Sequence, residues 1–345
     1  MKTLKICFVA LTLITIGFAS EAQGQTVKQY VNKVNPNASV RKAANGSIII
    51  VGKVDTVRAF SPYGGSSGTN YAEVANAYQA ALGSGVKVYC MPVPSACEFY
   101  MPKEGSAWTK SQCVTINNIF AHLKKGVTGV DVYTTLGRHA AEPIYSRTDH
   151  HWAPLGAYYA AQEFARVAKV PFKDLKSYEA HTVSNYVGSM YTYSKKDAAV
   201  KNSPENFVYY TPKTAKYTVT RTIYTVKKKT VTSEKVESPS RFFIPFKGSG
   251  AYCTFMGGDH NTTKVETNVN NGRRLLVIKD SFGNPIPGYL FYSFEQVHVI
   301  DFRYFNKSVK TYVQENGITD VLLVNALSLA VSSATCKQYI TILNR

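Results

Sequence analysis

The stretch RRLLVIKDSFGNP at residues 273–285 decides the fold prediction. Its apolar centre, Leu275 to Ile278, is typical of a short buried strand, and the strand runs directly into a polar turn at Asp280 and Ser281. Strands that are apolar throughout belong to parallel sheets covered by helices on both faces. Ligands of such open sheets bind at the carboxyl ends of the strands, so we expect Ser281 to face a crevice.

Similar apolar strands alternate with helical patterns on both sides of this stretch. Strands are predicted at 47–51, 86–94, 130–136, 296–302 and 319–326, and helices at 71–83, 114–126, 153–170 and 306–315. The alternation breaks at about 175–262, where helix signals are few and Thr, Tyr, Val and Lys are common. The predicted fold class is therefore α/β, a three-layer α/β/α parallel sheet with a β-rich insertion.

The composition excludes a mostly disordered chain, because 45% of the 345 residues are hydrophobic and only 18% are charged. The formal net charge is +18, which indicates an acidic partner. Nucleic acid, an anionic membrane surface and an anionic polysaccharide all fit this charge, and composition does not choose among them.

The N-terminus has the layout of a secretory signal peptide. Lys2 and Lys5 precede an apolar run at 6–19, and small residues then offer a cut after Ala22 or Gly24. The run has 14 residues, whereas a membrane span needs about 20, so an uncleaved anchor is the lesser alternative. We expect residues 1–24 to be removed and residues 25–345 to form a single periplasmic or secreted domain. Export argues against a nucleic-acid partner, and no later segment is apolar enough to be transmembrane.

Five cysteines remain after Gly24, and none forms a CxxC pair, so a zinc-ribbon or thioredoxin site is unsupported. Cys97 and Cys113 are the candidates for a disulfide. An odd number of cysteines leaves at least one free thiol.

Two polar motifs carry the chemistry, SRTDHHWAPLG at 146–156 and the strand-end DSFG described above. A serine hydroxyl is a weak nucleophile and needs a neighbouring base, which itself needs an orienting acceptor. We predict that Ser281 is the nucleophile, His151 the base and Asp149 the residue that orients His151. Oxyanion donors are expected from the Ser281 backbone N–H together with Gly257 and Gly258, or the Asn325 side chain.

Each of these residues also has a purely structural interpretation. A serine after a strand is frequently a turn residue or a helix N-cap. Adjacent histidines can bind metal, and a metal-dependent site would use His150, His151, Asp259 and His260. Trp152 is a candidate substrate contact, although buried packing is the commoner role of tryptophan.

The motifs TDHHW at 148–152, GGDH at 257–260 and VIKDSFGNP at 277–285 resemble those of the DHHW family of exported proteins. That family is similar to the SGNH-like proteins of alginate O-acetylation, in which a D-x-H-W motif precedes a serine motif. The resemblance spans about residues 45–345.

The resemblance implies an SGNH-hydrolase-like sheet with a permuted motif order. It assigns Asp149, His151 and Ser281 the orienter, base and nucleophile roles. The sequence departs from the usual Gly-Asp-Ser form at Lys279, and Arg303 with Tyr304 loosely resembles an arginine-containing stretch near the site of relatives.

Together these features predict an exported SGNH-like serine O-acetyltransferase or acetylesterase that acts on a cell-envelope or secreted polysaccharide. The chemistry needs no cofactor. The expected partners are a polysaccharide acceptor and an acyl donor, which a membrane acyl-transfer partner could supply. Two rival hypotheses are a non-catalytic glycan-binding protein on a degenerate hydrolase scaffold and a metal-dependent hydrolase.

Overall fold

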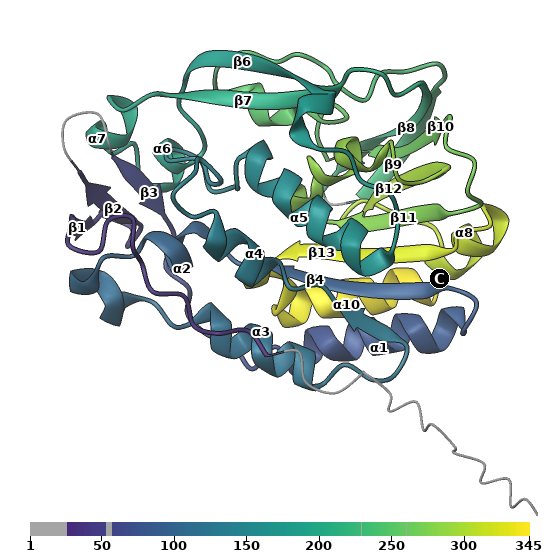
Figure 1. The fold of residues 1–345 in the computed structure, drawn as a ribbon, viewed down its shortest axis with the longest axis horizontal. Helices are drawn as coiled ribbons and strands as arrows, with labels where there is room; N and C mark the ends of the chain where they lie inside the picture. The colour runs from purple at the N-terminus through teal and green to yellow at the C-terminus, as the bar shows by residue number, and fades with distance from the viewer. Residues whose placement is uncertain (1–25, 53–56, 229, 260) are drawn as a thin grey trace, which may run out of the picture.

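The computed structural model describes residues 26–52, 57–228, 230–259 and 261–345, so the predicted signal peptide and His260 lie outside the described residues. No helix within these ranges is long and apolar enough to cross a membrane. Figure 1 shows the fold.

The helices and strands have the following bounds. The helices are α1 (Thr69–Leu82), α2 (Ala96–Tyr100), α3 (Gln112–Ala121), α4 (Val132–Arg138), α5 (Pro154–Ala168), α6 (Met190–Tyr193), α7 (Ala198–Lys201), α8 (Val309–Glu315), α9 (Leu327–Ala330) and α10 (Ser333–Leu343). The strands are β1 (Ser39–Lys42), β2 (Ile48–Val51), β3 (Arg58–Phe60), β4 (Lys87–Val93), β5 (Val127–Gly129), β6 (Tyr178–Tyr186), β7 (Glu205–Pro212), β8 (Tyr217–Lys227), β9 (Thr230–Glu237), β10 (Asn261–Thr267), β11 (Arg274–Lys279), β12 (Gln296–Asp301) and β13 (Asp320–Ala326).

The centre of the fold is an eight-stranded sheet with the order β5-β4-β13-β11-β12-β10-β8-β9. The first five strands in this order are parallel, and β10, β8 and β9 continue the sheet in antiparallel fashion. All seven residues of β13 are buried, as expected for a strand covered on both faces. The predicted α/β class is confirmed, with a sheet that is mixed and mainly parallel.

Helices cover the two faces of this sheet. Helices α1 and α10 pack against each other below β4 and β13 in Figure 1, while α5 crosses on the opposite side. Helix α5 begins at Pro154, whose fixed φ suits a first helical turn, and it buries an apolar stripe that includes Leu155 and Phe164. One contiguous apolar core therefore joins the sheet to both helix layers.

Two predicted strands differ from the structure. Residues 130–136 were expected as a strand, but they begin α4, because the Asp131 side chain caps that helix by accepting a hydrogen bond from Thr134 N at 2.8 Å. The predicted strand at 47–51 forms β2, which pairs with β1 and β3 in a separate antiparallel sheet. The parallel sheet thus lacks both segments.

The predicted β-rich insertion divides between two sheets. Strands β6 and β7 form a two-stranded antiparallel sheet, whereas β8 and β9 form a hairpin whose basic turn includes Lys227 and Lys228. The hairpin joins the main sheet because β8 pairs with β10.

The five cysteines among the described residues are free thiols, so the expected disulfide between Cys97 and Cys113 is wrong. Cys97 instead lies within hydrogen-bonding distance of Ser95 and Gln112, and Cys113 donates to the Val27 carbonyl.

Candidate active site

Ser281 lies at the carboxyl edge of the main sheet, directly after β11. The preceding Asp280 is buried, and its Oδ1 accepts from Phe282 N at 2.8 Å, so Asp280 and not Ser281 caps the short 3-10 turn Ser281–Gly283. Oδ2 of Asp280 accepts from Ala326 N at 3.0 Å, which ties the turn to the end of β13. Ser281 is left half-buried on the wall of a cleft of about 260 Å³.

The structure brings Asp149, His151 and Ser281 into one line of hydrogen-bonding contacts. Nε2 of His151 lies 2.8 Å from Oγ of Ser281, and its Nδ1 lies 2.6 Å from Oδ1 of Asp149. The carboxylate fixes the ring by accepting from Nδ1–H, which leaves Nε2 free to take a proton from the serine. The geometry is that of a nucleophile, a base and an orienting acid.

The loop that carries Asp149 is held by residues of the predicted insertion. Thr148 donates through its N–H and its hydroxyl to Glu205 Oε1, each at 2.7 Å. Ser189 N donates to Asp149 Oδ2 at 2.8 Å, and Gly188 N donates to the Thr148 hydroxyl at 3.1 Å. None of these three supporting residues belongs to a motif that the sequence singled out.

Charge in the line follows from burial and pairing. Burial alone would raise the pKa of Asp149, but the neighbouring His151 outweighs it and holds that pKa well below the ordinary range. Burial, with the nearby His151, lowers the pKa of His150 to about 4, so His150 is neutral at pH 7. Burial raises the pKa of Asp280 to about 6. Asp149 is therefore the ionised member of the line.

Tyr252 is a site residue that sequence reasoning missed. Its ring stacks on His151 with centroids 3.8 Å apart and planes 7° from parallel, and its hydroxyl donates to the Ser281 carbonyl at 2.9 Å. One side chain therefore contacts the His151 ring and the Ser281 backbone at the same time. The sequence around it, GSGAYCT, carries no signal that marks it as part of a site.

Arg303 lines the same cleft, but acids hold its guanidinium. It donates to Asp301 through Nε and Nη2, at 2.8 and 2.6 Å, and Nη2 also contacts Asp259 at 2.9 Å. Lys279, the residue that departs from the Gly-Asp-Ser form, contacts the same two acids through Nζ. The two acids and two bases form a closed charge network behind the serine turn.

The other predicted oxyanion and substrate residues lie outside the cleft lining. Asn325 is fully buried; its Oδ1 accepts from Tyr71 and Tyr339, and its Nδ2 contacts Asp280 at 3.3 Å. Trp152 is also fully buried and donates to the Phe282 carbonyl at 2.8 Å. Both residues therefore position the serine turn from behind. The remaining three do not line the cleft either: Gly257, Gly258 and Tyr304.

Three side chains that could bind a metal ion lie close together among the described residues. Donor atoms of Asp149, His150 and His151 lie within 4.8 Å of one another, while His260 is outside the described residues and Asp259 is bound to Lys279 and Arg303. The ring nitrogens of His151 contact Asp149 and Ser281, so a metal ion would have to displace those contacts. The same atoms fit proton transfer without rearrangement.

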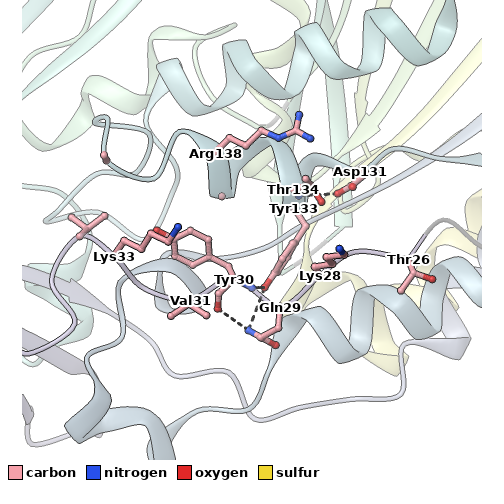
Figure 2. Close-up of a pocket in the computed structure, with 13 residues that line it drawn as sticks. Thr26, Lys28, Gln29, Tyr30, Val31, Lys33, Asp131, Tyr133, Thr134 and Arg138 are labelled. Atoms are coloured by element: carbon pink, nitrogen blue, oxygen red, sulfur yellow. Dashed lines mark hydrogen bonds between the residues drawn. The ribbon is translucent and has the colours of Figure 1, made fainter.

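A larger cavity of about 730 Å³ lies elsewhere, between residues 26–34 and α4. Figure 2 shows Lys28, Lys33 and Arg138 among the residues that line it, together with Tyr30 and Tyr133. Among the described residues that line this cavity there is no Ser, Cys or His, so it holds no Ser–His–Asp arrangement like that of the smaller cleft. Size alone therefore does not identify the reactive cleft.

Comparison with known proteins places the chain among proteins with these motifs. The sequence profile of the DHHW protein family matches residues 20–300. A DHHW family protein from Eubacterium siraeum is 36% identical, with a TM-score of 0.80 over 88% of this chain and 98% of that chain. PatB1 from Bacillus cereus, solved with a sulfonyl adduct, is 20% identical, with a TM-score of 0.64 over 84% of this chain and 97% of that chain.

The O-acetyltransferase domain of AlgJ from Pseudomonas putida is 12% identical, with a TM-score of 0.44 over 86% of this chain and 98% of that chain. No curated protein matches the sequence. The likeness to PatB1 shows a shared fold.

Proposed function

The chain belongs to the DHHW protein family, and we propose that it is a serine O-acetyltransferase or acetylesterase that acts on a cell-envelope or secreted polysaccharide. The observation that carries this proposal is the contact of His151 with both Asp149 and Ser281, at 2.6 and 2.8 Å. A serine with only a structural role has no need of an imidazole held by a carboxylate.

In the first half-reaction the Ser281 Oγ attacks the carbonyl carbon of an acetyl ester, and its proton moves to His151 Nε2. Asp149 accepts from Nδ1–H and stabilises the positive charge on the imidazolium. The tetrahedral intermediate then breaks its bond to the donor oxygen, which takes the proton from His151 and leaves as an alcohol. The acetyl group remains as an ester on Ser281.

In the second half-reaction a sugar hydroxyl or water attacks the acetyl-serine, and its proton moves to His151 Nε2. Collapse of the second intermediate releases the acetylated sugar or acetate, and Ser281 recovers its proton from His151. Transfer and hydrolysis differ only in which hydroxyl enters the cleft. The proposed steps use no cofactor, because Ser281 forms the covalent ester and His151 accepts and returns the proton.

Two features support stabilisation of the intermediates. The Ser281 backbone N–H is a donor next to the forming oxyanion, where one such donor is worth about 10²–10³ in rate. Tyr252 fixes the plane of the His151 ring by stacking on it, so the base keeps its alignment between proton transfers. The Ser281 N–H and the Tyr252 ring are both in place before substrate binds.

Export and the polysaccharide partner belong to the same proposal. The basic start and the apolar run at 6–19 support secretion, and the net charge of +18 suits an anionic envelope polymer rather than nucleic acid once the chain is exported. An acyl donor in the envelope could come from a membrane acyl-transfer partner.

The test is the burst of p-nitrophenol from p-nitrophenyl acetate, with mass spectrometry of the peptide that contains Ser281. Wild-type protein should acquire an acetyl group there, and a sulfonyl fluoride should block it, in line with the adduct found on PatB1. Ser281→Ala should reduce the burst by at least about 10³-fold. The matched control is Ser333→Ala, which changes an exposed serine on α10. Activity that survives Ser281→Ala, or a wild type that no serine reagent labels, would overturn the mechanism and favour a glycan-binding role.

A further inference from the structure

One aromatic side chain is exposed among the described residues that line the cleft beside Ser281. Four aromatic residues line it, and three of them, Phe60, Tyr63 and Phe282, are at most 5% exposed. The fourth, Tyr193 at the end of α6, is 49% exposed. A large ring that borders a reactive cleft and remains open to solvent is available to stack against a ligand.

The position of Tyr193 is fixed from two sides. Its carbonyl accepts hydrogen bonds from the side chains of Asn45 and Ser47, in the turn between β1 and β2. Its ring centroid lies 5.2 Å from that of His150, and the ring of His150 lies 3.7 Å from that of His151. Tyr193 is therefore two ring contacts away from the base that contacts Ser281.

The charge of the cleft selects the kind of ligand. Among the described residues that line it, the charged ones are Asp280 and Arg303, and Arg303 is bound by Asp301 and Asp259. The cleft lining thus carries no excess of positive charge, so it suits an uncharged ligand better than an anion.

The hydroxyls of the cleft complete the pattern. Ser61 and Ser328 line it and are exposed, so their side chains can donate to or accept from a ligand hydroxyl. One face of a pyranose ring is apolar and its rim carries hydroxyls. An open aromatic face with serine hydroxyls around it matches both parts of such a ring.

We propose that Tyr193 is the stacking platform of an acceptor subsite for a neutral pyranose ring, which presents a ring hydroxyl to the acetyl group on Ser281. This inference rests on the proposed function and adds the chemical class of the acceptor. The uncharged sugar occupies the cleft, and the charged parts of an envelope polymer lie outside it.

The experiment uses the mature chain with p-nitrophenyl acetate as donor and neutral xylo-, cello- and maltohexaose as acceptors. Wild-type protein should show a saturable, acceptor-dependent acceleration of turnover with at least one acceptor, together with an acetylated oligosaccharide in the mass spectrum. Tyr193→Ala should raise the half-saturating acceptor concentration about fivefold, and Tyr193→Phe should leave it near the wild-type value because the ring remains. The matched control is Phe246→Ala, which removes a 37%-exposed ring outside the cleft.

Three outcomes would overturn the inference while the proposed function survives, and each requires an intact wild-type burst. These are no acceleration by any of the three neutral acceptors, an unchanged half-saturating concentration in Tyr193→Ala, and an equal rise in Phe246→Ala. Absence of the burst in wild-type protein would instead refute the proposed function, and the acceptor subsite with it.

Discussion

Gly188 packs closely against Asp149, and this contact makes Gly188→Ala a sharp test. A Cβ on residue 188 would lie 2.4 Å from the Asp149 Cβ and 2.5 Å from its Oδ2, whereas ordinary contacts begin at 3.4 Å. The shortfall is about 1 Å on both atoms. Gly188 is buried, and its N–H is bonded to Thr148, so the aspartate loop has to move away from the new methyl group.

A displacement of this size breaks the line of contacts. If Asp149 moves by about 1 Å along the contact, its 2.6 Å separation from His151 Nδ1 exceeds hydrogen-bonding distance. A misplacement of about 1 Å costs about 10²-fold in rate, and complete loss of the orienting acid costs about 10⁴-fold. We therefore expect Gly188→Ala to lower kcat/KM for p-nitrophenyl acetate by between about 10² and 10⁴. Overpacking should also lower the free energy of unfolding by about 1–3 kcal/mol.

Burst kinetics and urea unfolding measure the two effects separately. The matched control is Gly85→Ala, since a Cβ there meets nothing within 4 Å. A folded Gly188→Ala protein with a rate within threefold of wild type would show that Asp149 does not orient His151, and the reasoning would fail.

Two further predictions concern Tyr252 and His298. Tyr252→Phe removes the hydrogen bond to the Ser281 carbonyl but keeps the ring on His151, so kcat should fall by about tenfold or less. Tyr252→Leu removes the ring as well, so kcat should fall further. Equal losses of kcat in the two variants, measured in burst assays, would contradict the role of stacking. His298 is fully buried, and burial, with Lys264 and Arg274 nearby, lowers its pKa from 6.5 to about 3. Between these two pKa values His298 binds a proton in the unfolded chain but not in the folded chain. The free energy of unfolding should therefore fall as pH drops below 6.5, by about 2.7 kcal/mol at pH 4.5. Urea unfolding of His298→Gln should show a pH slope smaller by about one proton, and an unchanged slope would refute the assignment.

The central strands could be predicted because burial on both faces makes them apolar throughout. Strands 86–94, 296–302 and 319–326 were confirmed as β4, β12 and β13. Residues 130–136 failed because Val130, Val132 and Tyr133 favour strands intrinsically, and that preference hid the capping signal of Asp131. The capping by Asp131 and the packing of α4 on α5 therefore outweigh the strand propensity of these residues.

The candidate site could be predicted only in part. The Asp149-x-His151 spacing lets the carboxylate reach the ring within one loop, and a strand end presents Ser281, so both signals are local. The supporting contacts of Glu205, Ser189 and Tyr252 connect residues far apart in the sequence, and a single sequence holds no trace of such pairings. Their discovery required the fold.

The distance along the chain between the reacting groups has a consequence for how the protein reaches activity. His151 and Ser281 are 130 residues apart, and the loop of His151 is anchored by β7, which lies between them. Pairing of segments at such separation is slow, because the chain loses the entropy of loop closure before the stabilising long-range contacts form. Enzymatic activity should therefore return in the last phase of refolding, after helix formation and collapse, so the burst assay doubles as a probe for completion of the fold.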